Sequence, residues 1–204
     1  MSIQKLSAFS DQNQGGNPAG VALYDGDLPD TEQMQADAAR IGFSETVFAA
    51  RSGEDDTTWR VRYFSPESEV PFCGHATIAL GAALASKAGP GTFRLQLNDA
   101  AISVEGAATG DLFTATLQSP PTRSAVLTDD QTADTLALFG YDISQLNTEF
   151  APAHIHGGAD HRLLVLKDRT DLAAMSYDLD AGRDFMRDQG LVTIMLAWHA
   201  GGNR

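Results

Sequence analysis

The fold of this chain is decided by Arg62-Tyr-Phe-Ser-Pro-Glu-Ser-Glu69-Val-Pro-Phe-Cys73-Gly74-His75-Ala76-Thr77. This stretch predicts a strand that ends in a proline turn, followed by a helix over residues 77–87 made almost wholly of small and apolar residues. A helix without a polar face is typical of a buried position, so we expect it to be enclosed. Its first turn leaves backbone N–H groups unpaired at the positive end of the helix dipole, where a carboxylate can bind without Lys or Arg.

The rest of the first half predicts a mostly β unit around this helix. A helix is expected to begin at Asp30, which forms a capping-box-like pair with Gln33, and to stop at Gly42. A glycine-rich loop is expected at residues 13–20, where glycine permits close approach of the backbone to a neighbour or ligand. Alternating or apolar runs predict strands at residues 3–9, 21–24, 59–64, 93–97, 102–104 and 113–117.

A second unit is expected after Ser119-Pro120-Pro121, because two successive prolines cannot continue a strand ladder. Thr128 and Gln131 predict another capping box, for a helix that runs to Phe139 and stops at Gly140. A strand at residues 162–166, a helix at 180–189 and an apolar strand at 191–198 follow. We therefore predict an N-terminal domain at residues 1–118 and a C-terminal domain at residues 122–204.

Composition excludes several classes of protein. The 204 residues are 43% hydrophobic, which is ample for a packed core, and 14 basic against 27 acidic residues give a net charge of −13. That balance disfavours nucleic acid and anionic membranes as partners, since phosphate binding needs clustered Lys and Arg. The sequence shows no apolar run of about 20 residues and no signal peptide. The single cysteine excludes an internal disulfide, so we expect a cytoplasmic protein.

Three segments, in this order and spacing, resemble the PhzF-like family of phenazine-biosynthesis isomerases. They are Gly15-Gly-Asn17-Pro18-Ala19-Gly-Val, Phe43-Ser44-Glu45-Thr46-Val-Phe, and the stretch from Arg62 to Thr77. The resemblance covers essentially the whole chain, more loosely after Pro120. It implies the α+β fold of diaminopimelate epimerase, in which two similar domains each wrap a curved mixed sheet around a central apolar helix.

The chain departs from the family pattern in its second half. Family members carry an Asp-Pro-x-Thr-Gly-Ser-like loop that heads the second central helix and supplies an opposing acid, and these 204 residues contain no such stretch. We expect a C-terminal domain that is incomplete before its central helix, either because the chain is truncated or because the protein has lost half of its active site. The apolar strand at residues 191–198 would then lack a packing partner, which predicts a homodimer.

The resemblance implies a cofactor-independent isomerase or epimerase of biosynthetic type, acting on a small carboxylate-bearing metabolite by general acid/base catalysis. It assigns the proton transfer to Glu45 and a donor or relay role to His75. The N–H groups of Gly74, His75 and Ala76 would hold the substrate carboxylate, and Asn17 would line the cleft. From the residues alone, Glu45 is more often a solvated loop carboxylate and Asn17 a turn former, and His75 can be a helix residue that only satisfies local backbone.

Cys73 has two interpretations. Related epimerases have a catalytic thiol here, and a helix N-terminus lowers a thiol pKa. A two-thiol racemase needs a second cysteine, however, and this chain has one. We prefer a small apolar residue that lines the substrate site.

Three histidines, His154, His156 and His161, invite a zinc interpretation. No Cys or Glu completes the set, so we expect surface or cleft-lining histidines and predict no metal and no cofactor. No Gly-x-Ser-x-Gly elbow supports a serine hydrolase. The alternative function is a non-catalytic protein that binds a small anion or a partner and has lost the opposing acid.

Overall fold

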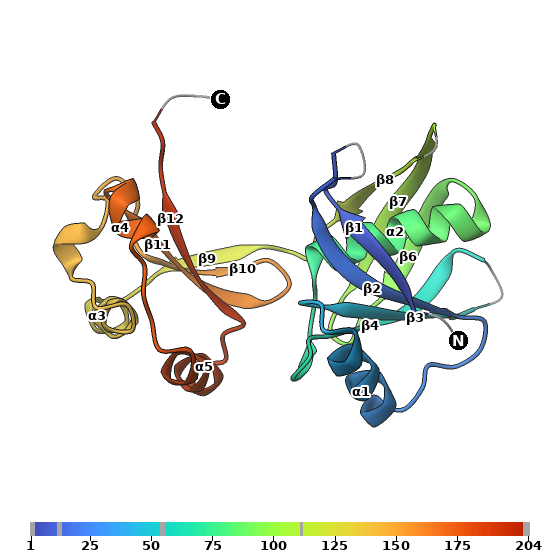
Figure 1. Cartoon of the computed structure of the whole chain (residues 1–204), viewed down its shortest axis with the longest axis horizontal. Coiled ribbons are helices and arrows are strands. Elements are labelled where there is room, and N and C mark those ends of the chain that lie inside the picture. The colour runs from blue at the N-terminus through green and yellow to red at the C-terminus, as the bar shows by residue number, and fades with distance from the viewer. Residues whose placement is uncertain (1–2, 12–13, 54–55, 111, 202–204) are drawn as a thin grey trace. The chain divides into compact units, whose positions relative to one another are not determined.

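The computed structural model describes residues 3–11, 14–53, 56–110 and 112–201. The chain divides into two compact units, Met1–Pro120 (unit 1) and Pro121–Arg204 (unit 2), which are described separately below (Figure 1). None of the described helices is long and apolar enough to cross a membrane.

Unit 1 is built on one mixed, eight-stranded sheet with the order β1-β2-β3-β4-β6-β7-β8, and β5 pairs with β4. The pairs β2/β3 and β4/β6 are parallel, and the other pairs are antiparallel. The strands are β1 (Gln4–Ala8), β2 (Asn17–Tyr24), β3 (Thr46–Arg51), β4 (Thr58–Phe64), β5 (Glu69–Val70), β6 (Gly91–Gln96), β7 (Ala101–Thr109) and β8 (Leu112–Gln118).

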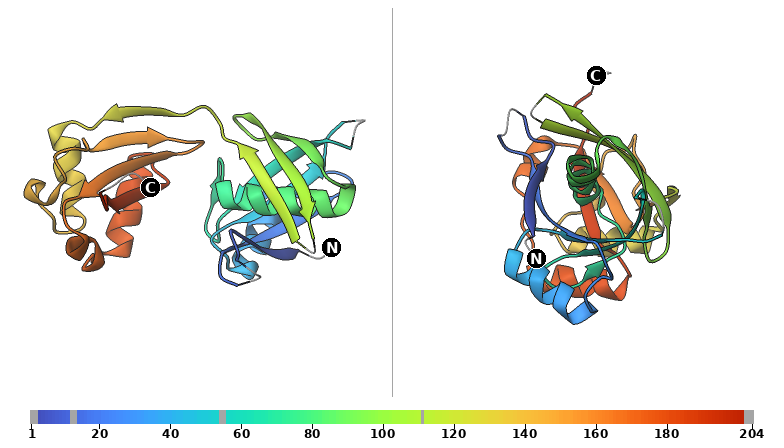
Figure 2. Two further views of the ribbon diagram at one scale, coloured as in Figure 1. Left: turned by 90° about the horizontal axis from the view of Figure 1, so that it is seen from above. Right: turned by 90° about the vertical axis from the view of Figure 1, so that its right-hand side faces the viewer.

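The helix α2 (Gly74–Ala88) lies inside the curve of this sheet, and the view along its axis shows strands around it (Figure 2, right). It contacts strands β1, β2, β3, β6, β7 and β8, and most of its residues are buried. The enclosed apolar helix predicted from the sequence is confirmed. The predicted start at Thr77 is wrong by three residues, because Gly74, His75 and Ala76 already form the first turn.

The helix α1 (Thr31–Ile41) covers the other face of the sheet, where Met34 and Ala38 pack against Phe48 and Phe64. Its predicted ends are confirmed. The Asp30 carboxylate accepts a hydrogen bond from the Gln33 N–H at 2.8 Å, and Gly42 ends the helix in the left-handed conformation, with φ 71°. The Gln33 side chain donates to Asp37 instead of closing a full capping box.

The second half of the glycine-rich loop predicted at residues 13–20 is strand. Asn13 lies outside the described residues, and the segment from Asn17 onward belongs to β2, where it pairs with β1 from Ala8 back to Gln4. Antiparallel pairing with β1 overrides the turn propensity of Asn and Pro here. Proline is tolerated at position 18 because β3 pairs with β2 only from Gly20 onward.

Unit 2 has a four-stranded sheet with the order β12-β11-β10-β9, in which β11 and β12 are parallel. The strands are β9 (Arg123–Val126), β10 (Ala153–His156), β11 (Asp160–Leu166) and β12 (Thr193–Trp198). The helices are α3 (Asp129–Ala137), the 3-10 turn η1 (Ile143–Gln145), α4 (Arg169–Ala173) and α5 (Leu179–Asp188). A core of leucines holds them together, namely Leu127, Leu136, Leu146, Leu164 and Leu166.

The capping box of α3 is confirmed, with both the Thr128 and the Gln131 side chains bonded to backbone N–H groups. The sequence analysis did not predict three short elements of unit 2, namely β9, β10 and α4. Each has only four or five residues and lacks a clear apolar period. No helix in the described part of unit 2 is apolar and enclosed in the way that α2 is.

Candidate active site

Glu45 is held at the start of β3 by its main chain. Its carbonyl accepts a hydrogen bond from the Gly20 N–H at 3.2 Å, and the next residue, Thr46, is fully buried against Gly20. A Cβ on Gly20 would lie 2.7 Å from Thr46 Oγ1 and 2.9 Å from Thr46 Cγ2. Glycine is therefore required at position 20 for β2 and β3 to approach closely next to Glu45.

The first turn of α2 is anchored from strand β4. The Cys73 carbonyl accepts hydrogen bonds from the Thr77 N–H at 3.0 Å and from the Thr77 hydroxyl at 2.7 Å. The Tyr63 hydroxyl lies 2.7 Å from Thr77 Oγ1 and must donate to it, because the Thr77 proton is already used. Tyr63 and Thr77 thus position Cys73, a role that the sequence did not reveal although Thr77 follows Cys73 by one helical turn.

The turn between β4 and β5 is held by an ion pair. Arg62 donates to both carboxylate oxygens of Glu69, at 2.8 and 2.6 Å, and Asn98 adds a third bond at 2.7 Å. These bonds lower the pKa of Glu69, with the Arg62 hydrogen bond as the largest cause. The segment that leads into Cys73 is therefore fixed at its start.

Three predicted site residues, Glu45, Cys73 and His75, come together in unit 1. His75 Nε2 lies 3.6 Å from Glu45 Oε2, and Cys73 Sγ lies 3.2 Å from His75 Nδ1. One ligand-type atom from each residue lies within 4.8 Å of the others. The His75 side chain is 11% exposed and that of Glu45 is 22% exposed. This cluster is the candidate active site.

The His75 ring has one nitrogen without a partner. Nε2 is buried, and no described residue forms a hydrogen bond with it. The 3.6 Å separation from Glu45 Oε2 is longer than a hydrogen bond. A buried unpaired nitrogen beside a carboxylate is typical of a position that a bound group would satisfy.

Cys73 is a protonated thiol rather than a reactive thiolate. Burial raises the pKa of Cys73 to about 12, and the nearby Glu45 carboxylate raises it further. The N–H groups of Ala76 and His75 act in the opposite direction but do not outweigh burial. The lowered pKa considered for a thiol at a helix N-terminus is therefore wrong here. Burial destabilises the thiolate more than the N–H groups at the helix end stabilise it.

The predicted carboxylate subsite faces open space. A Cβ added to Gly74 would meet no atom within 4 Å, so a ligand can approach the first turn of α2 there. The first three N–H groups of a helix have no partner within the helix. Those of His75 and Ala76 also act on the Cys73 sulfur, so a bound carboxylate would share donors with it.

Asn17 begins β2 and is exposed, opposite Ala8 of β1. It lies three residues before Gly20, at the end of β2 from which the Gly20 N–H bonds the Glu45 carbonyl. Its role in lining the cleft stays a prediction.

Two histidines of unit 2 lie against an aspartate. Asp160 Oδ1 lies 2.9 Å from His154 Nε2, 3.1 Å from His156 Nδ1 and 2.9 Å from Arg123 Nη2. These contacts lower the pKa of Asp160, the His154 hydrogen bond being the largest cause. His161 turns instead to Thr193 Oγ1, at 2.7 Å. The histidines are therefore divided between two sets of partners.

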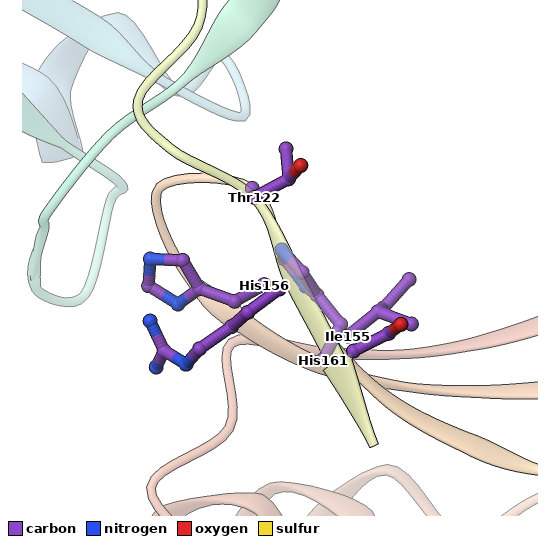
Figure 3. Close-up of a pocket in the computed structure, with 7 residues that line it drawn as sticks. Thr122, Ile155, His156 and His161 are labelled. Carbon is purple, nitrogen blue, oxygen red and sulfur yellow. The ribbon is translucent and has the colours of Figure 1, made fainter. Parts of the chain in front are cut away.

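An open cavity of about 500 Å³ lies at this end of unit 2, lined by Thr122, Ile155, His156 and His161 among others (Figure 3). Among the described residues that line it there is no carboxylate, so it lacks the acid that proton transfer needs. We therefore place the candidate active site at Glu45, Cys73 and His75.

Comparison with known proteins gives the family. Residues 6–204 match the family model described as phenazine biosynthesis-like protein. The uncharacterized isomerase YddE of Escherichia coli K12 is 32% identical over 194 residues, which cover 88% of this chain and 60% of that protein. An uncharacterized isomerase of Deinococcus radiodurans is 51% identical over 81 residues, or 40% of this chain and 25% of that protein.

Solved structures show the same fold. A protein from Pseudomonas aeruginosa titled a predicted epimerase has a TM-score of 0.81 at 22% identity, covering 95% of this chain and 68% of that one. A probable proline racemase from Agrobacterium radiobacter has a TM-score of 0.54 at 12% identity, covering 92% and 57%. The α+β, diaminopimelate epimerase-like fold expected from the sequence is confirmed. The chain spans 60% of YddE, and its match with the family model shows that it belongs to the phenazine biosynthesis-like (PhzC-PhzF) family.

Proposed function

We propose that this protein is a cofactor-independent isomerase or epimerase that moves a proton on a small carboxylate-bearing metabolite. The observation that carries the proposal is the pairing of Glu45 with His75, 3.6 Å apart, beside the open first turn of α2. A base, a second proton carrier and a set of N–H donors are what proton transfer next to a carboxylate needs. The names of the relatives, isomerase and epimerase, agree with this reaction class.

Each group has a separate task in this proposal. The substrate carboxylate binds at the N–H groups of Gly74, His75 and Ala76, where the helix dipole favours negative charge. Glu45 takes the proton from the adjacent carbon, and the same donors stabilise the charge that spreads onto oxygen. His75 Nε2, which has no other partner among the described residues, is free to donate a hydrogen bond or to relay the proton. Cys73, as a buried protonated thiol, does not act as the base.

The second candidate is a protein that binds a small anion without turning it over. One observation favours it: among the described residues, Glu45 supplies the only carboxylate at the cluster, and the Cys73 thiol stays protonated. Moving a proton from one face of a carbon to the other needs two groups on opposite sides. The two candidates differ in whether a bound carboxylate exchanges its carbon-bound hydrogen.

The test is hydrogen exchange in heavy water. The chain is incubated with a panel of small carboxylic acids that carry a C–H next to the carboxylate, and loss of that proton signal is followed by NMR. We expect exchange with at least one acid, and we expect Glu45→Gln to abolish that exchange. The control, Glu105→Gln, removes an exposed carboxylate of the same unit and should leave the exchange rate unchanged. Binding without exchange would favour the second candidate, and binding far from Glu45 and His75 would contradict both.

Several further properties belong to this proposal. The single cysteine favours a cytoplasmic location. The acidic net charge of −13 argues against nucleic acid and membrane partners. The ligand in this proposal is the small carboxylate at the first turn of α2.

A further inference from the structure

We propose that Glu45, Cys73 and His75 form a binding site for a thiophilic divalent cation, with Zn²⁺ as the cation that fits best, and that its occupancy blocks the site. Only the blocking of proton transfer rests on the function proposed above. Cation binding itself stands on the geometry of the three side chains.

The three side chains offer the donor set that zinc takes in proteins: a thiolate sulfur, an imidazole nitrogen and a carboxylate oxygen. One such atom from each residue lies within 4.8 Å of the other two. Bonds of about 2.0 to 2.3 Å at tetrahedral angles place two ligands about 3.3 to 3.6 Å apart. The observed 3.6 Å between His75 Nε2 and Glu45 Oε2 is close to that range, whereas the 3.2 Å contact of Cys73 Sγ is to the other ring nitrogen, Nδ1. One cation binds one ring nitrogen, so rotation of the Cys73 and His75 side chains has to bring Sγ and Nε2 onto the same ion.

A second observation points to a missing ligand at the same place. His75 Nε2 is buried and has no hydrogen-bond partner among the described residues. An unsatisfied buried nitrogen calls for an explanation, and an ion is one that satisfies it fully. Glu45 Oε2 lies 3.6 Å from this nitrogen, and Cys73 Sγ lies beside the other ring nitrogen, Nδ1.

Charge also favours a divalent cation. The Glu45 carboxylate and the Cys73 thiolate together neutralise two positive charges, and the thiol proton passes to solvent when the metal binds. The positive end of the α2 dipole opposes the cation, but it amounts to about half a charge against two full ones. Three protein ligands leave a fourth position for water, as in zinc sites that stay open to small molecules.

The competing place for a metal is the group His154, His156 and Asp160 of unit 2. There the Asp160 Oδ1 atom already accepts from Arg123 at 2.9 Å, and a cation would have to displace that guanidinium. His154 Nε2 also forms a hydrogen bond with this oxygen at 2.9 Å, and His156 Nδ1 lies 3.1 Å from it without hydrogen-bond geometry. We therefore assign the cation to unit 1 and use unit 2 as the control.

The single cysteine makes the test specific. Because Cys73 is the only thiol in the chain, any thiolate-to-cobalt charge-transfer absorption in the near ultraviolet reports this site alone. We expect Co²⁺ to develop this band up to one equivalent per chain and Zn²⁺ to abolish it by displacement. Zn²⁺ should also protect Cys73 from alkylation by iodoacetamide. A Co²⁺-saturated chain without the band would overturn the proposal.

Variants locate the ligands. Cys73→Ser removes the thiolate and places a residue suited to the N-cap position of α2, and Glu45→Gln removes the carboxylate while leaving Cys73 in place. We expect the affinity for Zn²⁺, measured calorimetrically, to fall at least about tenfold in each. His156→Gln should leave it unchanged. Circular dichroism establishes that each variant is folded, and Zn²⁺ binding that survives in both unit 1 variants, or is lost in His156→Gln, would place the metal elsewhere and refute the site.

The outcome is separable from that of the proposed function. Cation binding is measured without any organic ligand, so a cobalt band in a chain that exchanges no proton supports the site and counts against the isomerase. In a chain that does exchange, saturating Zn²⁺ should suppress exchange to the level of Glu45→Gln. Exchange that continues at saturation would disprove the blocking, whatever the binding.

Discussion

At the scale of single residues, the site depends on positions where a side chain is missing. Gly20 lets β2 approach Thr46 next to Glu45, and Gly74 leaves space in front of the first turn of α2. These two glycines have different consequences. The first is needed for packing, since an added methyl would collide with Thr46, whereas the second has room for one.

Replacement of Gly74 therefore separates binding from stability. We expect Gly74→Ala to keep the free energy of unfolding, or to raise it by up to about 1 kcal/mol, since Ala is the better helix former. Affinity for a small carboxylic acid should fall, because the methyl group projects into the space where the carboxylate would approach the N–H groups. NMR titration measures the affinity and urea denaturation measures the stability. Gly182→Ala, in α5 and equally uncrowded, is the matched control. Unchanged affinity in Gly74→Ala would place the carboxylate elsewhere.

At the scale of elements, α2 and β7 approach each other closely at two glycines. A Cβ on Gly106 of β7 would lie 2.5 Å from the Gly81 carbonyl oxygen and 2.8 Å from Ala85 Cβ. A Cβ on Gly81 would lie 2.5 Å from Val104 Cγ2. The curved sheet can close around the helix because these two residues are glycines.

Gly106→Ala should therefore destabilise unit 1 by about 1 to 3 kcal/mol, the cost of overpacking against backbone that cannot move. The control is Gly91→Ala on β6, directly opposite Gly106 in the ladder, where an added Cβ meets nothing within 4 Å. Chemical denaturation followed by tryptophan fluorescence measures both variants, since Trp59 is buried in this core. Equal stabilities for the two variants would contradict the close packing of α2 on β7.

The turn that leads into α2 predicts a pH dependence. The pKa of Glu69 is lowered in the folded state, chiefly by Arg62, so its ion pair contributes stability above the ordinary pKa of about 4.3. That contribution is lost as the pH falls through the lowered pKa. Glu69→Gln should cost about 1 to 2 kcal/mol at pH 7 and make the decline of the melting temperature below pH 5 less steep. Glu105→Gln, which removes an exposed carboxylate on β7, is the control. Parallel acid profiles for Glu69→Gln and the unchanged chain would show that the pair is not coupled to folding.

At the scale of the whole molecule, the chain consists of two units with separate cores, and the candidate active site lies in unit 1. The identification of residues 1–118 and 122–204 as two related domains, the second incomplete, stays a prediction. Unit 2 exposes apolar side chains on its outermost strand, with Met195 46% and Trp198 37% exposed. A strand of this kind at a sheet edge favours pairing with another chain.

We therefore expect a homodimer, detectable by sedimentation equilibrium. Met195→Lys should shift the equilibrium toward monomer, because a charge on the edge strand opposes strand pairing. Lys in place of the already exposed Leu112 of unit 1 is the control and should leave the equilibrium unchanged. A well-behaved monomer at high concentration would disprove the prediction.

Much of the fold was predictable because local chemistry and global structure agree. The cap at Asp30, the capping box at Thr128 and the apolar run of α2 each follow from short-range rules that the tertiary structure respects. The errors lie where pairing between strands decides. The sequence from Asn17 to Gly20 predicts a turn, but pairing with β1 makes it a strand. The short strands β9 and β10 show no clear hydrophobic period and form by pairing with each other.

The order of the motifs and the composition of α2 were sufficient to determine the family and an enclosed helix, since both depend on residues that are close together in the chain. Only the tertiary structure brought Glu45, from the start of β3, against Cys73 and His75, and only there does burial raise the pKa of the thiol that a helix end alone would lower. The reason is physical. A pKa and a ligand distance depend on what surrounds a group in space, and those neighbours come from distant parts of the sequence.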